Sequence, residues 1–448
     1  GGGGNGDDGV QRGGRHGMIV RDLAPPTLAM TNLILFQNVH VLDVRHGRRR
    51  AGQVLVEGDA IRSVSDAALP AEDARVIDGG GRTLMPGLID CHAHVTFSQT
   101  NLALLAATPQ TTLTLRALPI LRDMLARGFT TVRDAGGADW ALKQAIDDGL
   151  DGTVTGPRLF VSGPPLSPTG GHGDFRPRSD RLRPLDCPSC GVLQRLASTR
   201  VVDGVDGVRR AVRELLQMGA DQIKIMSSGG VASPTDPIDA LGYSVEETRA
   251  IVDEAAARHS YVLAHAYTPA AIRRAVECGV RSIEHGNLID APTAALMAER
   301  GAYAVPTLIT YEALARDGVR LGLGAESAVK IERVRAAGLR SLEIFKAAGV
   351  KLALGTDLLG GSHGLQSEEL LIRAQVQSNL EVLQSATLVG AELLGQAGRL
   401  GEVSPGARAD LLLVDGDPLQ DLHCLAGQGE HIALVMQGGH VRFDRRAT

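Results

Sequence analysis

Two patterns of hydrophobic and polar positions divide this chain into two ends and a middle. Near both ends, short apolar runs are separated by turns rich in glycine and aspartate, as where Gly58 and Asp59 follow residues 53–57. Such runs predict β-strands. In the middle, apolar runs alternate with amphipathic segments such as 208–219 and 246–259. This alternation of strand and helix predicts parallel α/β structure.

The strand-like ends predict one small domain that both ends of the chain build together. The runs expected to be strands are 34–43, 53–57, 60–64, 75–78, 409–415, 432–436 and 440–443. We predict a small β-sandwich domain made from residues 32–85 and 405–448. Residues 1–31 begin with four glycines and contain no sustained apolar run, so we expect a flexible N-terminal segment there.

The middle of the chain, residues 86–404, contains enough alternating units for a barrel. Its eight candidate strands are 88–93, 130–134, 158–162, 221–226, 261–266, 282–285, 303–307 and 351–357. Eight such units predict a (β/α)8 TIM barrel, so the expected fold class is α/β, with this barrel beside the small β-sandwich domain. In TIM barrels the functional groups lie at the C-terminal ends of the strands.

Composition and charge exclude two classes of partner. The 448 residues carry 46 basic and 51 acidic side chains, which gives a net charge of about −5. No basic block of the kind that follows a phosphate backbone occurs, so we expect no nucleic-acid partner. No run approaches the roughly 18 apolar residues that a membrane helix needs, so we expect no membrane partner. The expected location is the cytoplasm, or outside the cell if a signal peptide has been removed.

The five cysteines do not predict a disulfide framework in a chain of this length. The one closely spaced pair, Cys187 and Cys190, lacks the second pair of a zinc ribbon and follows a loop-like segment. We expect a loop disulfide or two unpaired thiols there, and a separate metal or redox role is the alternative.

Metal-ligating side chains recur at the ends of the predicted barrel strands. His92 and His94 lie two residues apart at the end of the first strand, so they point to the same face. His265, His285 and Asp357 lie at the ends of the fifth, sixth and eighth strands. A lone histidine in such a position is more often a core residue than a ligand. Four histidines and an aspartate at one rim of one barrel predict a metal site.

Lys224 is an unexpected charge inside the fourth predicted strand, where isoleucines flank it. An unpaired buried ammonium costs several kcal/mol, so this lysine should be neutralised, paired or chemically altered. One interpretation is a salt bridge to Glu284 or Asp357. The other is that carbon dioxide adds to the amine and forms a carbamate whose two oxygens bridge two metal ions.

Together these residues make the chain similar to the amidohydrolase superfamily, in its binuclear-metal subtype. The resemblance covers residues 33 to the C-terminus and implies two divalent metal ions. It implies that His92, His94 and Asp357 hold the more buried ion and that His265 and His285 hold the more exposed one, with carboxylated Lys224 as the bridge. Imidazole and carboxylate ligands suit zinc best, and manganese or cobalt are the substitutes.

A narrower resemblance is to the branch with Xaa-Pro dipeptidases, Xaa-Arg carboxypeptidases and ochratoxin-hydrolysing amidases. It rests on four loops, which are 133–136, 167–174, 227–234 and 265–268. This likeness implies that His172 polarises the substrate carbonyl or stabilises an oxyanion. Arg133 and Tyr267 are candidates for binding a free α-carboxylate, although Arg133 could equally form a barrel salt bridge and Tyr267 could be a packing residue.

The function implied by the resemblance is metal-dependent hydrolysis of an amide or peptide bond. A metal-bridging hydroxide attacks the carbonyl, and Asp357 carries the proton to the leaving amine. Because the loops show no acidic cluster for a basic side chain, we expect release of a C-terminal apolar or aromatic residue from N-acyl amino acids or dipeptides, with Phe97 and residues 308–311 lining the pocket. Relatives in this branch often form homo-oligomers, commonly octamers.

Two other functions stay open at this point. A ring-opening or deaminating relative, such as an imidazolonepropionase or a guanine-type deaminase, has the same barrel. Such enzymes commonly use one metal and do not need Lys224, so metal counting separates the two. A non-catalytic barrel scaffold is the second alternative, although such relatives typically lose metal ligands.

Overall fold

The structure is a computed structural model that describes residues 33–70, 72–149, 154–176, 199–233, 236–320 and 322–446. The predicted flexible segment 1–31 and the cysteines Cys187 and Cys190 lie outside these residues. Within the described ranges, no helix combines the length and the apolar character that crossing a membrane requires.

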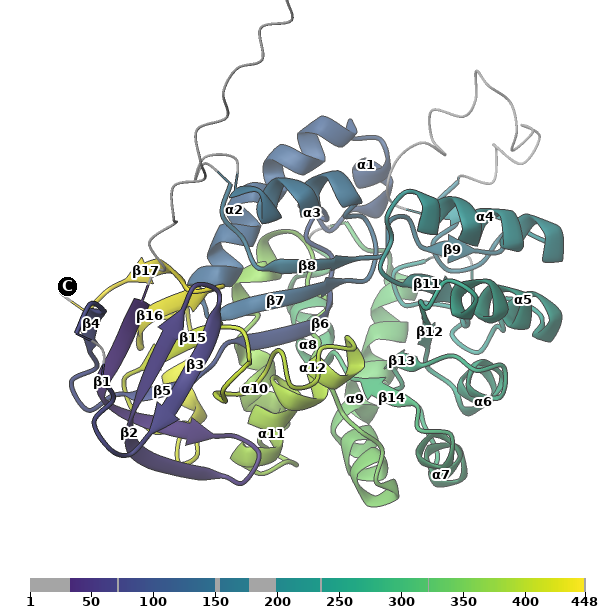
Figure 1. The fold of residues 1–448 in the computed structure, drawn as a ribbon. Helices are drawn as coiled ribbons and strands as arrows, with labels where there is room; N and C mark the ends of the chain where they lie inside the picture. Colours follow the sequence, from purple (N-terminus) through teal and green to yellow (C-terminus); the bar gives the residue numbers. More distant parts are fainter. Residues whose placement is uncertain are drawn as a thin grey trace, which may run out of the picture. The chain divides into compact units, whose positions relative to one another are not determined.

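The largest sheet among the described residues joins strands from both ends of the chain (Figure 1). Its order is β17 (His440–Asp444), β16 (Ile432–Gln437), β15 (Leu411–Val414), β5 (Thr83–Pro86), β1 (Leu33–Asp43), β2 (Arg48–Glu57) and β3 (Ala60–Ser65), and β4 (Arg75–Asp78) pairs with β1. The antiparallel pair β5 and β15 makes the junction, with Leu84 opposite Leu413. Alternate residues of β15 face two cores: Leu411 and Leu413 pack inside this sheet, and Leu412 packs towards Phe129 of the barrel strands.

The parallel strands form two further sheets among the described residues. One contains β6 (Leu88–Ala93), β7 (Phe129–Asp134) and β8 (Arg158–Val161). The other has the order β10 (Arg200–Val201), β9 (Leu166–Ser167), β11 (Ile223–Met226), β12 (Val262–Ala266), β13 (Ser282–His285) and β14 (Tyr303–Val305). The backbone N–H of Asp221 donates to Val161 O at 2.8 Å, which connects the two sheets.

Seven of the eight predicted barrel segments are strands, and the eighth, 351–357, is not. It makes one isolated bridge, between Leu352 and Ala304. The Leu354 N–H donates to Ser385 O instead of continuing a ladder. The chain then turns at Asp357, whose φ is +54°. The segment still contacts β6, because the Cys91 N–H donates to Leu354 O at 2.7 Å.

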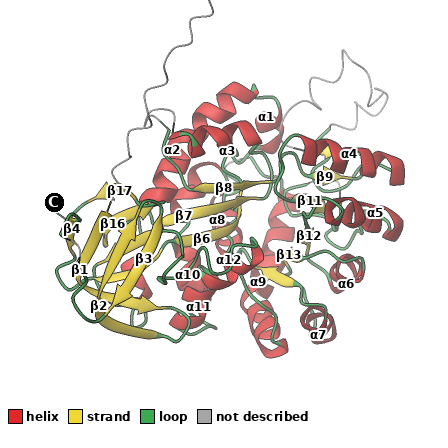
Figure 2. Ribbon diagram, viewed as in Figure 1, coloured by secondary structure: helices red, strands yellow, loops and turns green. Residues whose placement is uncertain are grey.

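Helices lie around the outside of the parallel strands (Figure 2). They are α1 (Leu102–Ala106), α2 (Gln110–Ala126), α3 (Trp140–Asp147), α4 (Val205–Gln217), α5 (Val245–Ala256), α6 (Pro269–Glu277), α7 (Ala291–Glu299), α8 (Leu308–Asp317), α9 (Ala325–Ala348), α10 (Glu368–Arg373), α11 (Asn379–Ser385) and α12 (Leu388–Leu393), with 3-10 helices η3 (Gly360–Leu365) and η4 (Leu422–Leu425). Helix α5 begins with a capping box, in which Ser244 and Glu247 each accept the other's backbone N–H.

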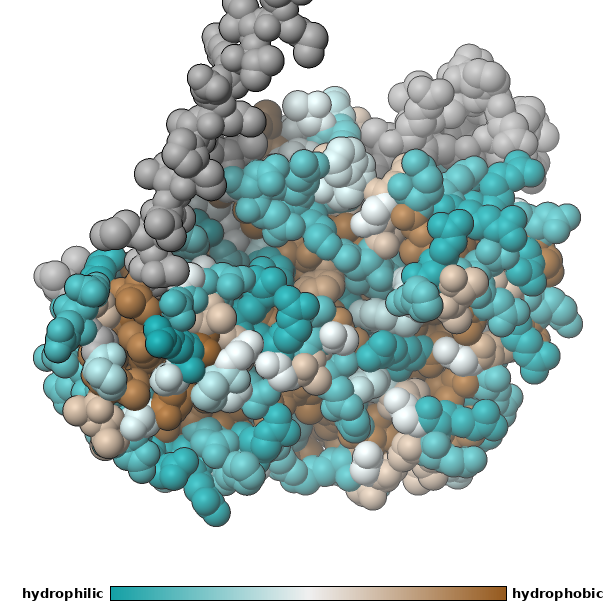
Figure 3. All heavy atoms as spheres, in the orientation of Figure 1, coloured by the Kyte–Doolittle hydropathy of each residue, from teal (hydrophilic) through white to brown (hydrophobic). Residues whose placement is uncertain are grey.

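The outer faces of these helices are polar where Figure 3 shows them. Hydrophilic side chains cover the helices of this face, and apolar atoms are seen mainly in recesses between them. Helix α4 illustrates the sequence cause, since Val208, Ala211, Val212 and Leu215 recur at helical spacing and are buried. The helices therefore pack their apolar stripes on the strands and leave the strand ends for polar chemistry.

Candidate metal centre

Four histidines and one aspartate come together at the C-terminal ends of the parallel strands. His92 lies on β6 and His94 directly follows it; His265 is the next-to-last residue of β12, and His285 ends β13. The imidazole centroids of His92 and His285 are 5.0 Å apart, and those of His265 and His285 are 4.8 Å apart. One ligand atom each of His92, His94 and Asp357 lie within 4.8 Å of one another. The donor set therefore fits a metal ion in kind and in spacing.

The backbone is strained at two members of this cluster. Asp357 has φ +54° and His285 has φ +73°, in the left-handed region that non-glycine residues rarely adopt. Asp357 is held there by its N–H, which donates to His92 O at 2.7 Å. Its Oδ1 lies 3.5 Å from His92 Nε2 and 3.2 Å from His94 Nε2. The strain places the carboxylate between the two imidazoles.

Each of the four imidazoles uses one ring nitrogen for a partner outside the cluster. The contacts are His92 Nδ1 to Glu284 Oε2 at 2.6 Å, His94 Nδ1 to Gly136 O at 2.8 Å, His265 Nε2 to Gly229 O at 3.1 Å and His285 Nδ1 to Thr307 Oγ1 at 2.8 Å. The second nitrogen of each ring is left for the cluster. Metal-bound histidines in proteins have this arrangement, because the outer partner sets the tautomer and the orientation of the ring.

Burial controls the charge of these groups. It lowers the pKa of His92, His265 and His285 well below the ordinary value, which favours the neutral imidazole that binds metal. For His94, burial acts in the same direction, but the Asp357 carboxylate outweighs it and raises the pKa. Burial alone would raise the pKa of Asp357, and the neighbouring His92 and His94 reverse this and lower it.

Lys224 lies at the base of the same cluster without an acidic partner. Its side chain is 2% exposed, and Nζ lies 3.4 Å from His92 Nε2. Among the described residues, no carboxylate oxygen lies within 4.0 Å of Nζ. The alternative of a salt bridge to Glu284 or Asp357 is therefore not observed. Burial lowers the pKa of Lys224 to about 8.

Arg133 does not contact the cavity, which corrects the expectation that it holds a substrate carboxylate. Its guanidinium is fully buried and donates to both carboxylate oxygens of Glu284 at 2.9 Å. Further donor groups bond Cys91 O at 2.5 Å and Ser282 Oγ at 3.0 Å. With its donors used inside the barrel, Arg133 orients Glu284, which in turn holds His92. An isolated charge in an apolar strand, such as Glu284 in β13, is the sequence signal for such a partner.

A cavity opens above the cluster and has one polar and one apolar side. Its lining includes the six cluster residues with His172, Tyr267 and Tyr311, and an apolar wall of Phe97, Leu102, Pro165, Phe175, Met226, Val231, Leu314 and Leu359. Phe97 and Tyr311 were expected from the sequence. The other apolar residues were not, because they come from separate loops, helices and one strand end that only the folded chain brings together.

His172 and Tyr267 both line the cavity above the cluster. The imidazole of His172 is 4.4 Å from that of His265 between centroids, and its Nδ1 is 2.5 Å from Ser233 Oγ. Burial lowers the pKa of His172 to about 4, so the ring is neutral near pH 7. The Tyr267 hydroxyl accepts a hydrogen bond from the Tyr311 hydroxyl at 3.0 Å.

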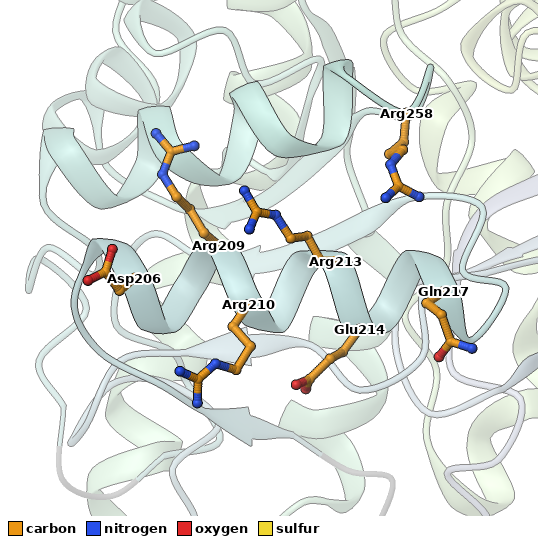
Figure 4. A pocket seen from close by; sticks show the side chains of 7 residues that line it. All are labelled: Asp206, Arg209, Arg210, Arg213, Glu214, Gln217 and Arg258. Atoms are coloured by element: carbon orange, nitrogen blue, oxygen red, sulfur yellow. The ribbon is translucent and has the colours of Figure 1, made fainter.

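A second hollow on the surface has different chemistry. It lies over α4 and the end of α5 and is lined by Asp206, Arg209, Arg210, Arg213, Glu214, Gln217 and Arg258 (Figure 4). Arg209 and Arg213 both bond Glu254 of α5, at 2.8 and 2.6 Å. In Figure 4, Arg210 and Glu214 lie on the other side of the helix from this pair. Arg209, Arg213 and Glu214 of this hollow form ion pairs, and none of the candidate site residues lines it.

Comparisons with known proteins agree with this geometry. The profile of the amidohydrolase family matches residues 83–441. Ochratoxinase from Aspergillus niger is 33% identical over 391 residues, which cover 84% of this chain and 79% of that protein.

Two crystal structures are closer in sequence. An amidohydrolase is 57% identical, with a TM-score of 0.89 over 92% of this chain and 99% of the other. A prolidase complexed with N-methylphosphonate-L-proline is 52% identical, with a TM-score of 0.88 and the same coverage. The chain therefore has the TIM-barrel type of α/β fold, belongs to the amidohydrolase family and is a hydrolase that acts on amide or peptide bonds.

Proposed function

We propose that this enzyme is a metal-dependent amidase or exopeptidase that releases a C-terminal apolar or aromatic residue from N-acyl amino acids or dipeptides. The observation that carries the proposal is the single cavity in which the six-residue cluster faces an apolar wall. The similarity to ochratoxinase and to a prolidase complexed with N-methylphosphonate-L-proline supports the same class of substrate.

The residues that would hold the metal are those of the cluster. We assign His92, His94 and Asp357 to one divalent ion and His265 and His285 to a second, with Lys224 between them. The metal centre, when bound, supplies a water nucleophile with a pKa near neutrality and polarises the substrate carbonyl. Imidazole nitrogen and carboxylate oxygen donors favour zinc, with manganese or cobalt as substitutes.

Lys224 would join the metal site as a carbamate. The ammonium first loses one proton, and the neutral amine then adds to carbon dioxide: one N–C bond forms, one C=O π bond opens to a carboxylate oxygen, and a second proton leaves the nitrogen. The product carries one negative charge and two oxygen donors, and the ammonium charge disappears. The burial of Nζ beside His92, without a carboxylate partner among the described residues, supports this proposal.

The remaining roles follow from where protons can move. Asp357 lies between His92 and His94 and would accept the proton of the attacking water, then deliver it to the leaving amine, which departs poorly unless protonated. His172 is neutral, and its Nδ1 lies beside Ser233 Oγ. If the serine hydroxyl donates to Nδ1, the ring proton is on Nε2, and this N–H would donate to the substrate carbonyl oxygen. Because Tyr311 donates to Tyr267, the Tyr267 proton would bind a free α-carboxylate.

The finer architecture belongs to the same proposal. We assign residues 86–404 to a closed barrel and residues 32–85 with 405–448 to the β-sandwich domain. The hydrogen bonds of Asp221 to Val161 and of Cys91 to Leu354 support closure. A homo-oligomer such as an octamer stays a prediction from the resemblance.

The test of the function is a substrate panel. Purified enzyme with added zinc is mixed with N-acyl amino acids and Xaa-Xaa dipeptides, and the freed amino acid is quantified. We expect release of Phe, Leu, Met or Pro that stops with a chelator, together with about two metal ions per chain by elemental analysis. One ion per chain with release of ammonia or ring opening would favour the deaminating alternative instead.

Lys224→Ala tests the metal bridge. We expect loss of activity and of part of the bound metal, with partial recovery in the presence of acetate or propionate, because a short carboxylate can supply the missing oxygens. Lys351→Ala is the control, since Lys351 pairs with Glu392 at the surface. A Lys224→Ala enzyme with full activity and full metal content would contradict the bridge.

A further inference from the structure

The loop after β11, described over residues 227–233 and 236–242, contacts the candidate site at three points. Gly229 O accepts the hydrogen bond of His265 Nε2 at 3.1 Å. The Tyr267 backbone N–H donates to Ser228 Oγ at 3.2 Å. Ser233 Oγ lies 2.5 Å from His172 Nδ1. The position of this loop therefore determines where three site side chains lie.

The loop packs directly against His172 at Gly230. A Cβ atom built on Gly230 would lie 2.0 Å from His172 Nδ1, so only glycine allows this approach. A shift of the loop by a fraction of an ångström would move Ser233, and with it the ring of His172. Misplacement of about 1 Å can cost a factor of about 100 in rate.

One side chain outside the loop holds it. Lys330, on α9, donates from its ammonium to three backbone carbonyls, at 3.4 Å to Gly230, 2.8 Å to Ser233 and 2.6 Å to Asp236. An ammonium has three N–H donors, and all three are used here. The loop adds one closing bond of its own, from the Gly230 N–H to Asp236 Oδ2 at 2.7 Å.

We propose that Lys330 is a positioning residue for catalysis: it fixes the loop through three carbonyls so that Ser233 orients His172 towards the substrate carbonyl. This inference rests on the proposed function, because it concerns the role of His172 in that reaction. Lys330 itself acts through the loop.

The packing of α9 separates this role from fold stability. The helix is anchored by its apolar residues Ile331, Val334, Leu342 and Phe345, which are buried. The Lys330 ammonium is not needed for that packing. Its removal should loosen the loop and leave the helix in place.

Lys330→Met is the test, because methionine keeps the length of the side chain and removes the donors. We expect kcat to fall by about 10- to 100-fold with unchanged metal content. We also expect faster hydrogen exchange in peptides from 227–242. Lys346→Met is the matched control on the same helix, where the ammonium bonds Glu381 and Val376 O, and both readouts should stay at the wild-type level.

Combining Lys330→Met with His172→Ala shows whether Lys330 acts by positioning His172 or by a general effect on the structure. In a His172→Ala background, Lys330→Met should lower kcat by less than about twofold further, because the group that it positions is gone. A fall in kcat of about 10-fold or more on adding Lys330→Met to the His172→Ala enzyme would overturn the proposal. If the wild-type enzyme hydrolyses no substrate of the panel, the proposed function fails. The exchange experiment does not depend on that result: unchanged hydrogen exchange of the loop in Lys330→Met would show that Lys330 does not fix the loop, and would overturn the inference.

Discussion

At the residue scale, the site depends on the side chains of the cluster and equally on the residues that hold those side chains in place. His285 and Asp357 accept strained backbone angles, at a cost of about 1–3 kcal/mol each, and surrounding hydrogen bonds hold them there. Arg133 and Glu284 have no place in the cavity, yet they form the buried pair that orients His92. The chemistry at the strand ends therefore depends on residues one layer deeper.

Asp357→Asn tests the proton transfer. The amide keeps the shape of the side chain and one oxygen donor but cannot accept a proton, so we expect most of the metal to remain while kcat falls by about 10²- to 10⁴-fold. Metal content per chain and single-turnover rates are measured together. Near-normal turnover in this variant would assign the proton shuttle to another group.

At the element scale, neighbouring helices are joined by ion pairs as well as by apolar stripes. Glu254 of α5 bonds Arg209 and Arg213 of α4, which are partly exposed. The predicted barrel strands agree with the structure except the last, in which the Leu354 N–H donates to Ser385 O instead of continuing a ladder. Periodicity showed that this segment is apolar, but it carries no information about the helix end, Ser385 of α11, that accepts the Leu354 N–H.

Glu254→Gln tests the helix pair through its pH dependence. Hydrogen bonds from Arg213 and Arg209 lower the pKa of Glu254 from 4.5 to about 2. A lowered carboxyl pKa stabilises the fold fully above pH 4.5, and this contribution is lost as the pH falls towards 2. We expect the variant to lose about 1 kcal/mol of unfolding free energy at pH 7, after solvent screening, and the difference to shrink below pH 4.5.

Urea unfolding of both proteins across this pH range measures the effect. Glu214→Gln is the control, because Glu214 pairs with Arg200 at a more exposed position and should cost less than about 0.5 kcal/mol. An equal loss for Glu254→Gln at pH 7 and at the acid end would show that its charge is not the stabilising feature.

At the scale of the whole molecule, the sheet built from both chain ends packs against the parallel strands through one apolar cluster. β5 continues into β6 through Gly87, whose N–H donates to Asp410 O at 2.9 Å. A Cβ atom on Gly87 would lie 2.0 Å from Thr130 Oγ1, so the passage requires glycine. Met85, Leu412 and Phe129 pack in one apolar cluster across this junction. The strand that carries His92 is thus anchored to both ends of the chain.

Metal removal tests how far the centre stabilises the molecule. The cluster buries several polar and charged groups that a bound ion would neutralise, so metal binding to the folded state adds stability by mass action, about 4 kcal/mol at 1,000 times Kd. We expect the chelated protein to melt several degrees lower in differential scanning calorimetry, with recovery on adding zinc. An unchanged Tm with confirmed loss of metal would contradict a stabilising centre.

The sequence by itself determined the alternation of strands and helices, the strand ends where His92, His94, His265 and His285 lie, the apolar segment that leads to Asp357, and the anomaly of Lys224. These features depend on local periodicity and on single residues in apolar runs. Only the tertiary structure decided that Arg133 is used inside the barrel, that Lys224 has no carboxylate partner among the described residues, and that Lys330 reaches the loop beside His172. Such contacts join residues far apart in the chain, and their geometry exists only after the strands have packed.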